Sequence, residues 1–210
     1  MTTLSDILAK NQAWASATAK ADPDLFPALS KGQAPEILWI GCADSRVPAA
    51  QVLGAGPGDV FVHRNVANLV VHTDFNSLSV IQYAIEVLKV KHVIVCGHTS
   101  CGGVTAAMGD HSYGLIDNWL RHIKDVYAVH RDELEAISDD GARADALSRL
   151  NVAAQVRNLA HTPIAQKAWR AGQELTIHGL IYKLADGVID DLDCAVSGPD
   201  QLASPYPIGV

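Results

Sequence analysis

The stretch His92-Val-Ile-Val-Cys96 decides the fold, because it is a short, nearly continuous apolar run. Such runs are typical of parallel strands that are buried on both faces of a sheet. Glu36-Ile-Leu-Trp-Ile-Gly41 has the same character, and Val60–His63 is a shorter run of this kind. The three stretches predict three buried strands, which in chain order are Glu36–Gly41 as the first, Val60–His63 as the second and His92–Cys96 as the third.

The segment between the second and third of these strands predicts an amphipathic helix opened by Asn76. Its apolar residues recur at helical spacing, and they are Leu78, Ile81, Ile85 and Leu88. A strand, a helix and a strand in this order imply a right-handed crossover and a parallel sheet. The predicted fold class is therefore α/β, with a mostly parallel central β-sheet flanked by helices.

The second half of the chain predicts further helices and one more strand. Residues 112–130 and 145–171 have helical character, and the acidic stretch Ser138–Gly141 lies between them. Leu175–Tyr182 alternates between apolar and polar residues and predicts a strand. The acidic stretch Asp190–Asp193 predicts a solvated edge or turn.

The two ends of the chain have patterns of their own. Residues 4–19 predict an amphipathic helix that Ser5 or Thr3 could cap and that Asp22-Pro23 and Phe26-Pro27 end. This helix is expected to pack either on a neighbouring subunit or on its own domain. The tail is expected to be irregular because it contains Pro199, Pro205 and Pro207. The sequence has no internal repeat or domain linker, so we expect a single domain over residues 1–210.

Charge and hydropathy exclude several classes of partner. The 16 Lys and Arg residues against 23 Asp and Glu residues give a formal net charge of −7 without a basic cluster. Nucleic acid and anionic membrane surfaces are therefore not expected as partners. No apolar stretch approaches the roughly 18 residues that span a bilayer, and residues 1–20 lack a secretory pattern. We expect a cytoplasmic protein with reduced cysteines.

Two short motifs predict a metal site. Cys42-x-Asp44-x-Arg46 follows the first strand, and His98-x-x-Cys101 follows the third. Two thiols, one imidazole and one carboxylate are a complete tetrahedral ligand set for zinc. Ligands in open parallel sheets collect at the carboxyl ends of strands, so the motifs can converge. The Arg46 guanidinium can hold the Asp44 carboxylate off the metal and leave a coordination position for water, as catalytic zinc sites require.

Other readings of these and similar residues stay open. A closed zinc site that serves folding or regulation is an alternative, although a purely structural site has no need of Arg46. Cys96 and Cys194 lack ligand spacing and are expected to be small buried hydrophobic residues. Gly54-x-Gly56-x-Gly58 lacks the full dinucleotide fingerprint and opens no convincing helix.

Three segments in order resemble the signature of the β-class carbonic anhydrases. They are Leu38-Trp-Ile-Gly-Cys42-Ala-Asp44-Ser-Arg46-Val-Pro48, Phe61-Val-His-Arg-Asn-Val-Ala-Asn68 and Cys96-Gly-His98-Thr-Ser-Cys101-Gly-Gly103. The resemblance implies an α/β fold, one Zn2+ per subunit and interconversion of carbon dioxide and bicarbonate. It also implies a homodimer or homotetramer with active sites near the subunit interface.

The same resemblance implies a role for individual residues. Cys42, His98 and Cys101 match the zinc ligands, and Asp44 and Arg46 match a catalytic dyad in which Asp44 can also ligate the metal. Five further residues match substrate-binding positions, and they are Gln33, Phe61, Val66, Tyr83 and Gly102. A relative with the same zinc site that hydrolyses carbon disulfide or carbonyl sulfide is the nearest rival enzyme.

A further trio resembles a regulatory site. Trp39, Arg64 and Tyr182 match positions that hold a non-catalytic bicarbonate in the bicarbonate-regulated (type II) subclass of bacteria. Bicarbonate there stabilises a closed state in which Asp44 ligates zinc, so the resemblance implies allosteric and pH-sensitive control. The alternative is that the two aromatic residues belong to the core and Arg64 is a structural ion-pair partner.

Overall fold

The computed structural model describes residues 2–202, and the chain divides into two compact units that meet between Ala34 and Pro35. Of the tail prolines, Pro199 begins a short 3-10 helix, η3 (Pro199–Gln201), whereas Pro205 and Pro207 lie outside the described residues. The expected single domain over residues 1–210 stays a prediction.

The N-terminal unit consists of α1 (Leu4–Ala21) and α2 (Leu25–Leu29). Thr3 caps α1, because its hydroxyl accepts a hydrogen bond from the Asp6 N–H at 3.2 Å while the Asp6 carboxylate accepts from the Thr3 N–H at 2.8 Å. No residue of α1 is buried, and its apolar side chains are exposed. Pro27 was expected to break a helix but lies in the first turn of α2, where a missing N–H costs no hydrogen bond.

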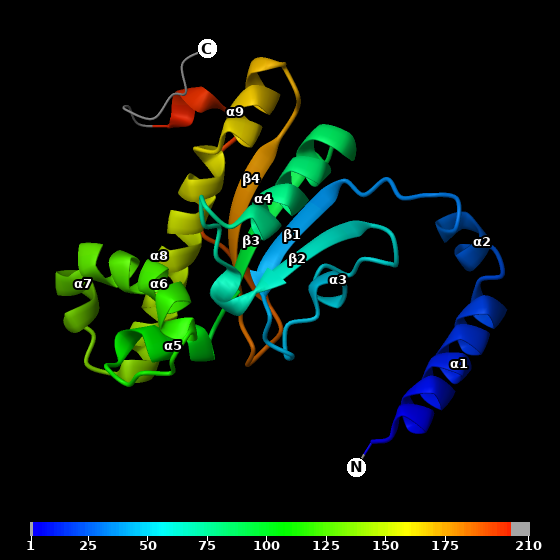
Figure 1. Cartoon of the computed structure of the whole chain (residues 1–210), viewed down its shortest axis with the longest axis horizontal. Coiled ribbons are helices and arrows are strands. Elements are labelled where there is room, and N and C mark those ends of the chain that lie inside the picture. The colour runs from blue at the N-terminus through cyan, green and yellow to red at the C-terminus, as the bar shows by residue number, and fades with distance from the viewer. Residues whose placement is uncertain (1, 203–210) are drawn as a thin grey trace. The chain divides into compact units, whose positions relative to one another are not determined.

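A five-stranded sheet organises the second unit (Figure 1). Its strands are β1 (Ile37–Cys42), β2 (Val60–Asn65), β3 (His92–His98), β4 (Thr176–Tyr182) and β5 (Ile189–Asp191). Their order is β2-β1-β3-β4-β5; the first four are parallel and β5 runs antiparallel to β4. The predicted fold class is confirmed, and the acidic stretch predicted as an edge or turn supplies the edge strand.

The strand order places a switch point between β1 and β3. The chain leaves β1 toward β2 on one side and then returns to form β3 on the other side. Cys42 pairs with Asn65 of β2, and Gly41 pairs with Cys96 of β3. The carboxyl ends of β1 and β3 therefore lie side by side, where open α/β sheets bind ligands.

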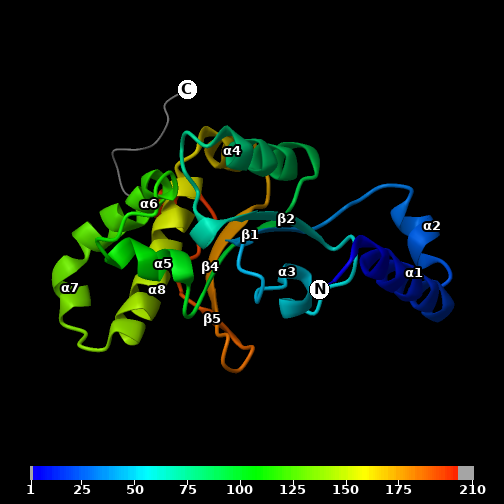
Figure 2. The ribbon, with the colours of Figure 1, turned by 60° about the horizontal axis from the view of Figure 1, so that its bottom comes forward.

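Helices cover the two faces of the sheet unequally. On one face, α4 (Phe75–Gln82), the helical turn η2 (Tyr83–Val87), α8 (Asp140–Ala160) and α9 (Pro163–Arg170) pack against a large apolar cluster. The opposite face carries Trp39 and Cys96 in a smaller cluster. Figure 2 shows α3 (Ala49–Val52) on the side of the sheet away from α4. No helix in the described part of the chain combines the length and apolar character needed to cross a bilayer.

A second group of helices surrounds the carboxyl ends of the strands. These are α5 (Gly102–Met108), α6 (Ile116–Val129) and α7 (Arg131–Glu135), which gather beside α8 in Figure 1. A separate apolar cluster joins them and includes Cys42, Ala67 and Cys101. Residues at or just after the ends of β1, β2 and β3 therefore pack against helices from the middle of the chain.

Several predicted helix boundaries differ from the structure because capping residues decide them. The predicted helix 145–171 is two helices, since the Thr162 hydroxyl caps α9 and Pro163 occupies its first position. Asp139 caps α8, so part of the predicted connection 138–141 is helical. Asp74, rather than Asn76, caps α4, and α6 begins at Ile116 instead of 112.

Candidate metal centre and active site

Three candidate metal-ligating residues from two strand ends converge on one buried point. Cys42 ends β1, His98 ends β3, and Cys101 is the residue before the first turn of α5. Their ligand atoms lie within 4.8 Å of one another, and all three residues are buried. Within residues 2–202, this is the one group of at least three such side chains close enough to share a metal ion.

The donor set fits zinc in geometry and in protonation. The Cys42 and Cys101 Sγ atoms are 4.0 Å apart, close to the ~3.8 Å that two zinc–sulfur bonds of about 2.3 Å subtend at a tetrahedral centre. His98 Nδ1 lies 2.9 Å from the Thr99 carbonyl oxygen and so carries the ring hydrogen. His98 Nε2 is buried without a hydrogen-bond partner among the described residues, which leaves its lone pair for a metal.

The two sulfur atoms lie within hydrogen-bond distance of each other and shift each other's pKa in opposite directions. Hydrogen bonding from Cys101 lowers the pKa of Cys42 to about 4, against the opposing effect of burial. The Ala67 N–H contributes in the same direction and lies 3.4 Å from the Cys42 sulfur. The same Cys42 sulfur raises the pKa of Cys101 well above its usual range. Binding of a cation favours loss of the remaining proton, because the thiolate is the form that ligates a metal.

Asp44 and Arg46 form a closely bonded pair beside the ligands. Arg46 Nε donates to Asp44 Oδ1 at 2.9 Å, Nη2 donates to Oδ2 at 2.7 Å, and the Arg46 N–H donates to Oδ1 at 2.9 Å. These bonds hold the pKa of Asp44 well below its usual range. Asp44 Oδ2 lies 3.8 Å from His98 Nε2, so the carboxylate is adjacent to the ligand cluster but bound to arginine.

Comparison with known proteins agrees with this geometry. The sequence pattern of the family described as carbonic anhydrase matches residues 37–189. A carbonic anhydrase of Emericella nidulans is 46% identical over 192 residues, which are 91% of this chain and 84% of that protein. One of Candida albicans is 39% identical over 194 residues, which are 91% of this chain and 68% of that protein.

This chain belongs to the β-class carbonic anhydrase family.

Solved β-carbonic anhydrases share its fold. A chain from the structures of two tetrameric enzymes of Sordaria macrospora has a TM-score of 0.88 and 45% identity, covering 91% of this chain and 97% of that chain. The Coccomyxa enzyme in complex with acetazolamide has a TM-score of 0.91 and 39% identity, covering 95% of this chain and 90% of that chain. The predicted family is confirmed, whereas the bacterial bicarbonate-regulated subclass stays a prediction.

The structure separates the predicted substrate-binding residues of this carbonic anhydrase. Val66 lies against the start of α5, because a Cβ added at Gly103 would come within 2.8 Å of Val66 Cγ1. Gly102, the first residue of α5, follows the ligand Cys101 directly. Gln33 is exposed and is described only within the N-terminal unit. The substrate roles of these residues stay predictions.

Phe61 and Tyr83 lie together but away from the ligands of the same chain. Their ring centroids are 5.8 Å apart. In the sheet, Phe61 lies opposite Leu38, and Asn65 lies opposite Cys42. Phe61 is therefore four residues along β2 from the level of Cys42. Four residues of extended strand span about 13 Å, so this aromatic pair is not part of the cluster's immediate surroundings within one chain.

The predicted regulatory trio comes from three strands, with Trp39 in β1, Arg64 in β2 and Tyr182 at the end of β4. Trp39 is fully buried in the cluster against which Tyr182 packs, and its Nε1–H has no hydrogen-bond partner among the described residues. Arg64 Nε donates to the Cys42 carbonyl at 2.9 Å, and its Nη2 donates to the Asp44 carbonyl. Arg64 thus holds the backbone on both sides of Ala43, a role that the amino-acid sequence alone did not suggest.

Sequence reasoning missed the residues that support the ligand loops from α8. Asn151 Nδ2 donates to the Ala67 carbonyl at 3.1 Å, and Gln155 Oε1 accepts from the Val70 N–H at 2.8 Å. Near the start of the helix, Asp145 Oδ1 accepts from the Ser100 N–H at 2.7 Å. One sequence feature could have indicated this role. Asn151 and Gln155 are two amide side chains four residues apart, on one face of an otherwise apolar stretch of the helix.

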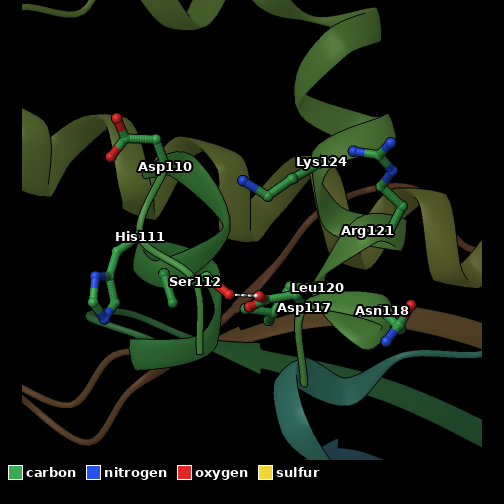
Figure 3. Close-up of a pocket in the computed structure, with 9 residues that line it drawn as sticks. Asp110, His111, Ser112, Asp117, Asn118, Leu120, Arg121 and Lys124 are labelled. Carbon is green, nitrogen blue, oxygen red and sulfur yellow. Dashed lines mark hydrogen bonds between the residues drawn. The ribbon is translucent and has the colours of Figure 1, made fainter. Parts of the chain in front are cut away.

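A separate pocket of about 380 Å³ lies between the end of α5 and α6 (Figure 3). Arg121 and Lys124 of α6 line it together with residues of the loop that precedes this helix, and Lys124 Nζ donates to the Gly109 carbonyl at 2.7 Å. The Ser112 hydroxyl donates to Asp117 at 2.6 Å across its floor. None of the predicted site residues lines this pocket.

Proposed function

We propose that this carbonic anhydrase catalyses the zinc-dependent, reversible hydration of carbon dioxide to bicarbonate and a proton. The observation that carries the proposal is a three-ligand cluster beside a carboxylate that Arg46 holds away from it. The cluster residues are buried, and the Asp44 carboxylate accepts three hydrogen bonds from Arg46. Such a site has ligands for a metal and an open position for water, which a structural zinc site lacks.

In this proposal each residue has a defined task. Cys42, His98 and Cys101 would hold one Zn2+, which when bound would supply a Lewis acid that makes water a nucleophile. Asp44, fixed by Arg46, offers a hydrogen-bond acceptor beside the cluster and orients water there. His98 keeps its Nε2 directed to ligation because its Nδ1–H is engaged by the Thr99 carbonyl.

We propose that the apolar wall of the substrate site comes from a second copy of the chain. Phe61 and Tyr83 form a contact about 13 Å along the strand from the Cys42 level, so one chain alone leaves the cluster without them. The exposed apolar side chains of α1 favour packing of that helix on a partner. This arrangement requires at least a homodimer. Gln33, Val66 and Gly102 complete the proposed substrate site. The relatives from Sordaria macrospora are tetrameric.

We also propose that bicarbonate regulates the site through Trp39, Arg64 and Tyr182. Among residues 2–202, the Trp39 Nε1–H is a buried donor without a hydrogen-bond partner, which an anion's oxygen would satisfy. Arg64 meanwhile holds the carbonyls of Cys42 and Asp44. An anion that drew Arg64 away would release this loop and allow Asp44 to approach the metal. A cytoplasmic location stays a prediction.

Stopped-flow carbon dioxide hydration from about pH 6.5 to 9, on protein with quantified zinc, tests these proposals. Activity that rises with pH supports the hydration reaction, and bicarbonate that extends the inactive range supports the regulatory trio. Activity without a bicarbonate effect keeps the enzyme and removes the regulatory site. Carbon disulfide and carbonyl sulfide hydrolysis, measured on the same protein, detects the rival activity. Zinc-loaded protein that acts on none of these substrates points to a non-catalytic site.

A further inference from the structure

The segment between the ligands His98 and Cys101 adopts an unusual backbone conformation. Ser100 has a φ of 54°, in the left-handed region that residues other than glycine seldom occupy. Its N–H donates to Asp145 Oδ1 of α8 at 2.7 Å, and its carbonyl accepts from Arg46 Nη2 at 3.2 Å. The two polar groups of one strained residue therefore connect α8 to the guanidinium that controls Asp44.

The neighbouring residue Thr99 is fixed from the other side. Its N–H donates to the Tyr182 carbonyl at 3.0 Å, and its hydroxyl accepts from the Leu184 N–H at 3.0 Å. These contacts tie Thr99 to β4 and the turn after it, but they do not restrain the backbone dihedral angles of Ser100. Asp145 supplies that restraint with a short, charge-assisted hydrogen bond of the stronger kind.

We propose that Asp145 is a positioning residue for the reaction, a role that rests on the proposed function. By holding the Ser100 N–H, Asp145 keeps Ser100 left-handed and turns its carbonyl toward Arg46. Arg46 then has a fixed place from which it binds both oxygens of Asp44 and keeps this carboxylate away from the ligand cluster. The same restraint sets the direction from which the Cys101 thiol enters the cluster.

Loss of the hydrogen bond between Ser100 and Asp145 should change the active site as well as the stability of the fold. A merely structural bond would affect stability alone. Loss of the Asp145 restraint should free the Ser100 carbonyl, loosen Arg46 and move Asp44 toward the metal, as removal of Arg46 itself would. Asp145 touches neither the ligand cluster nor Asp44 directly in the structure, so its effect must pass through Ser100.

The test compares D145A and D145N with wild type, and D140A of the same helix is the control. Asp140 is exposed and makes its ion pair with Arg143 of the same helix. We expect D145A to lower kcat about 10- to 100-fold with KM changed less than about twofold, because outer contacts of metal sites have effects of this size. D145N should recover most of kcat because its amide oxygen still accepts from Ser100. D140A should match wild type.

Two readouts do not depend on activity. Amide hydrogen exchange of the metal-free protein should accelerate about tenfold or more at Ser100 in D145A, and it should be unchanged in D140A. The visible spectrum of the cobalt(II)-substituted D145A should shift toward that of R46A, which reports carboxylate ligation. If D145A does not fold, Asp145→Ser, whose shorter side chain cannot reach Ser100, takes its place with the same expectations.

Each outcome decides between the proposals. Wild-type kcat, Ser100 exchange and cobalt spectrum in D145A would overturn the role of Asp145 while leaving the hydration reaction intact. Faster exchange with an unchanged spectrum and kcat would reduce the contact to a structural one and also overturn the role. An inactive wild-type protein would refute the proposed function, and the exchange and cobalt measurements would still report on Asp145.

Discussion

Replacing Asn151 by alanine should destabilise the fold and weaken the metal site together. Asn151 is 1% exposed, its Nδ2 donates to the Ala67 carbonyl at 3.1 Å, and its Oδ1 accepts from Gln155 Nε2 at 2.9 Å. Ala67 has a φ of 63°, and its N–H lies 3.4 Å from the Cys42 sulfur. The amide of Asn151 therefore holds a strained residue that in turn hydrogen-bonds a metal ligand.

The magnitude follows from the groups that the substitution leaves without partners. The Ala67 carbonyl and Gln155 Nε2 would each lose a buried hydrogen bond, and each such loss costs about 1–3 kcal/mol. We expect the free energy of unfolding to fall by about 2–6 kcal/mol. At about 2–4 °C per kcal/mol for a chain of 210 residues, this corresponds to a decrease in Tm of about 4–24 °C.

Urea and thermal unfolding at fixed protein and zinc concentrations measure this change, because metal binding and assembly shift apparent stability. S148A is the matched control, since Ser148 is 3% exposed on the same helix but its hydroxyl donates only to the Ala144 carbonyl of that helix. We expect S148A to cost less than about 1 kcal/mol. Zinc affinity, measured by chelator competition, should fall about 10-fold or more in N151A alone. Equal stability and zinc affinity in N151A and S148A would refute the reasoning.

Three further predictions concern the site and its flanking cysteine. R46A should retain zinc but lose hydration activity, because Asp44 is then free to ligate the metal; full activity in stopped-flow assays of the zinc-loaded variant would contradict this. Chelation of zinc should abolish activity, and added zinc should restore it in proportion to metal content measured by atomic absorption. Burial raises the pKa of Cys96 to about 12 from 9.0, so the folded state excludes its thiolate. The free energy of unfolding should therefore fall as pH rises from 9 toward 12, and urea unfolding at about pH 8 and 10.5 should show a smaller loss in C96V than in wild type.

The sequence contained enough information to locate the strands and the three side chains that cluster at their ends. Buried parallel strands are short apolar runs, so His92–Cys96 and Glu36–Gly41 predicted β3 and β1 to within two residues at each end. Ligands at the carboxyl ends of two such strands follow from the topology of open sheets, and Cys42 and His98 are the last residues of their strands. In these segments the local sequence pattern and the overall fold favour the same structure.

Helix boundaries were harder because two signals compete there. Apolar periodicity continues through 145–171, whereas a threonine followed by proline at Thr162 ends one helix and begins another. The prediction followed the apolar periodicity, whereas in the structure the Thr162 cap decides where one helix ends and the next begins. Asp139 shows the same conflict, since an acidic stretch resembles a loop but the carboxylate of this N-cap residue accepts a hydrogen bond from the Ala142 N–H at 2.7 Å.

The supports of the site were beyond reach of sequence patterns, because they join segments that are far apart in the chain. Asn151 and Ala67 are 84 residues apart, and Asp145 and Ser100 are 45 residues apart. No motif relates a helix amide to the φ angle of an alanine in another loop. Only the placement of α8 against both ligand loops makes these contacts visible.

Strain explains why α8 has these polar side chains at all. Ala67 and Ser100 are left-handed without being glycine, and such residues cost energy unless their surroundings over-determine them. Each follows a strand of the sheet, each has a polar group next to a ligand or to Arg46, and each is restrained by one side chain of α8. Glycine at either position would remove the strain but would also free the loop to rotate. Restrained alanine and serine instead give one defined conformation, so a helix that does not contact the metal determines how its ligands and its dyad are presented.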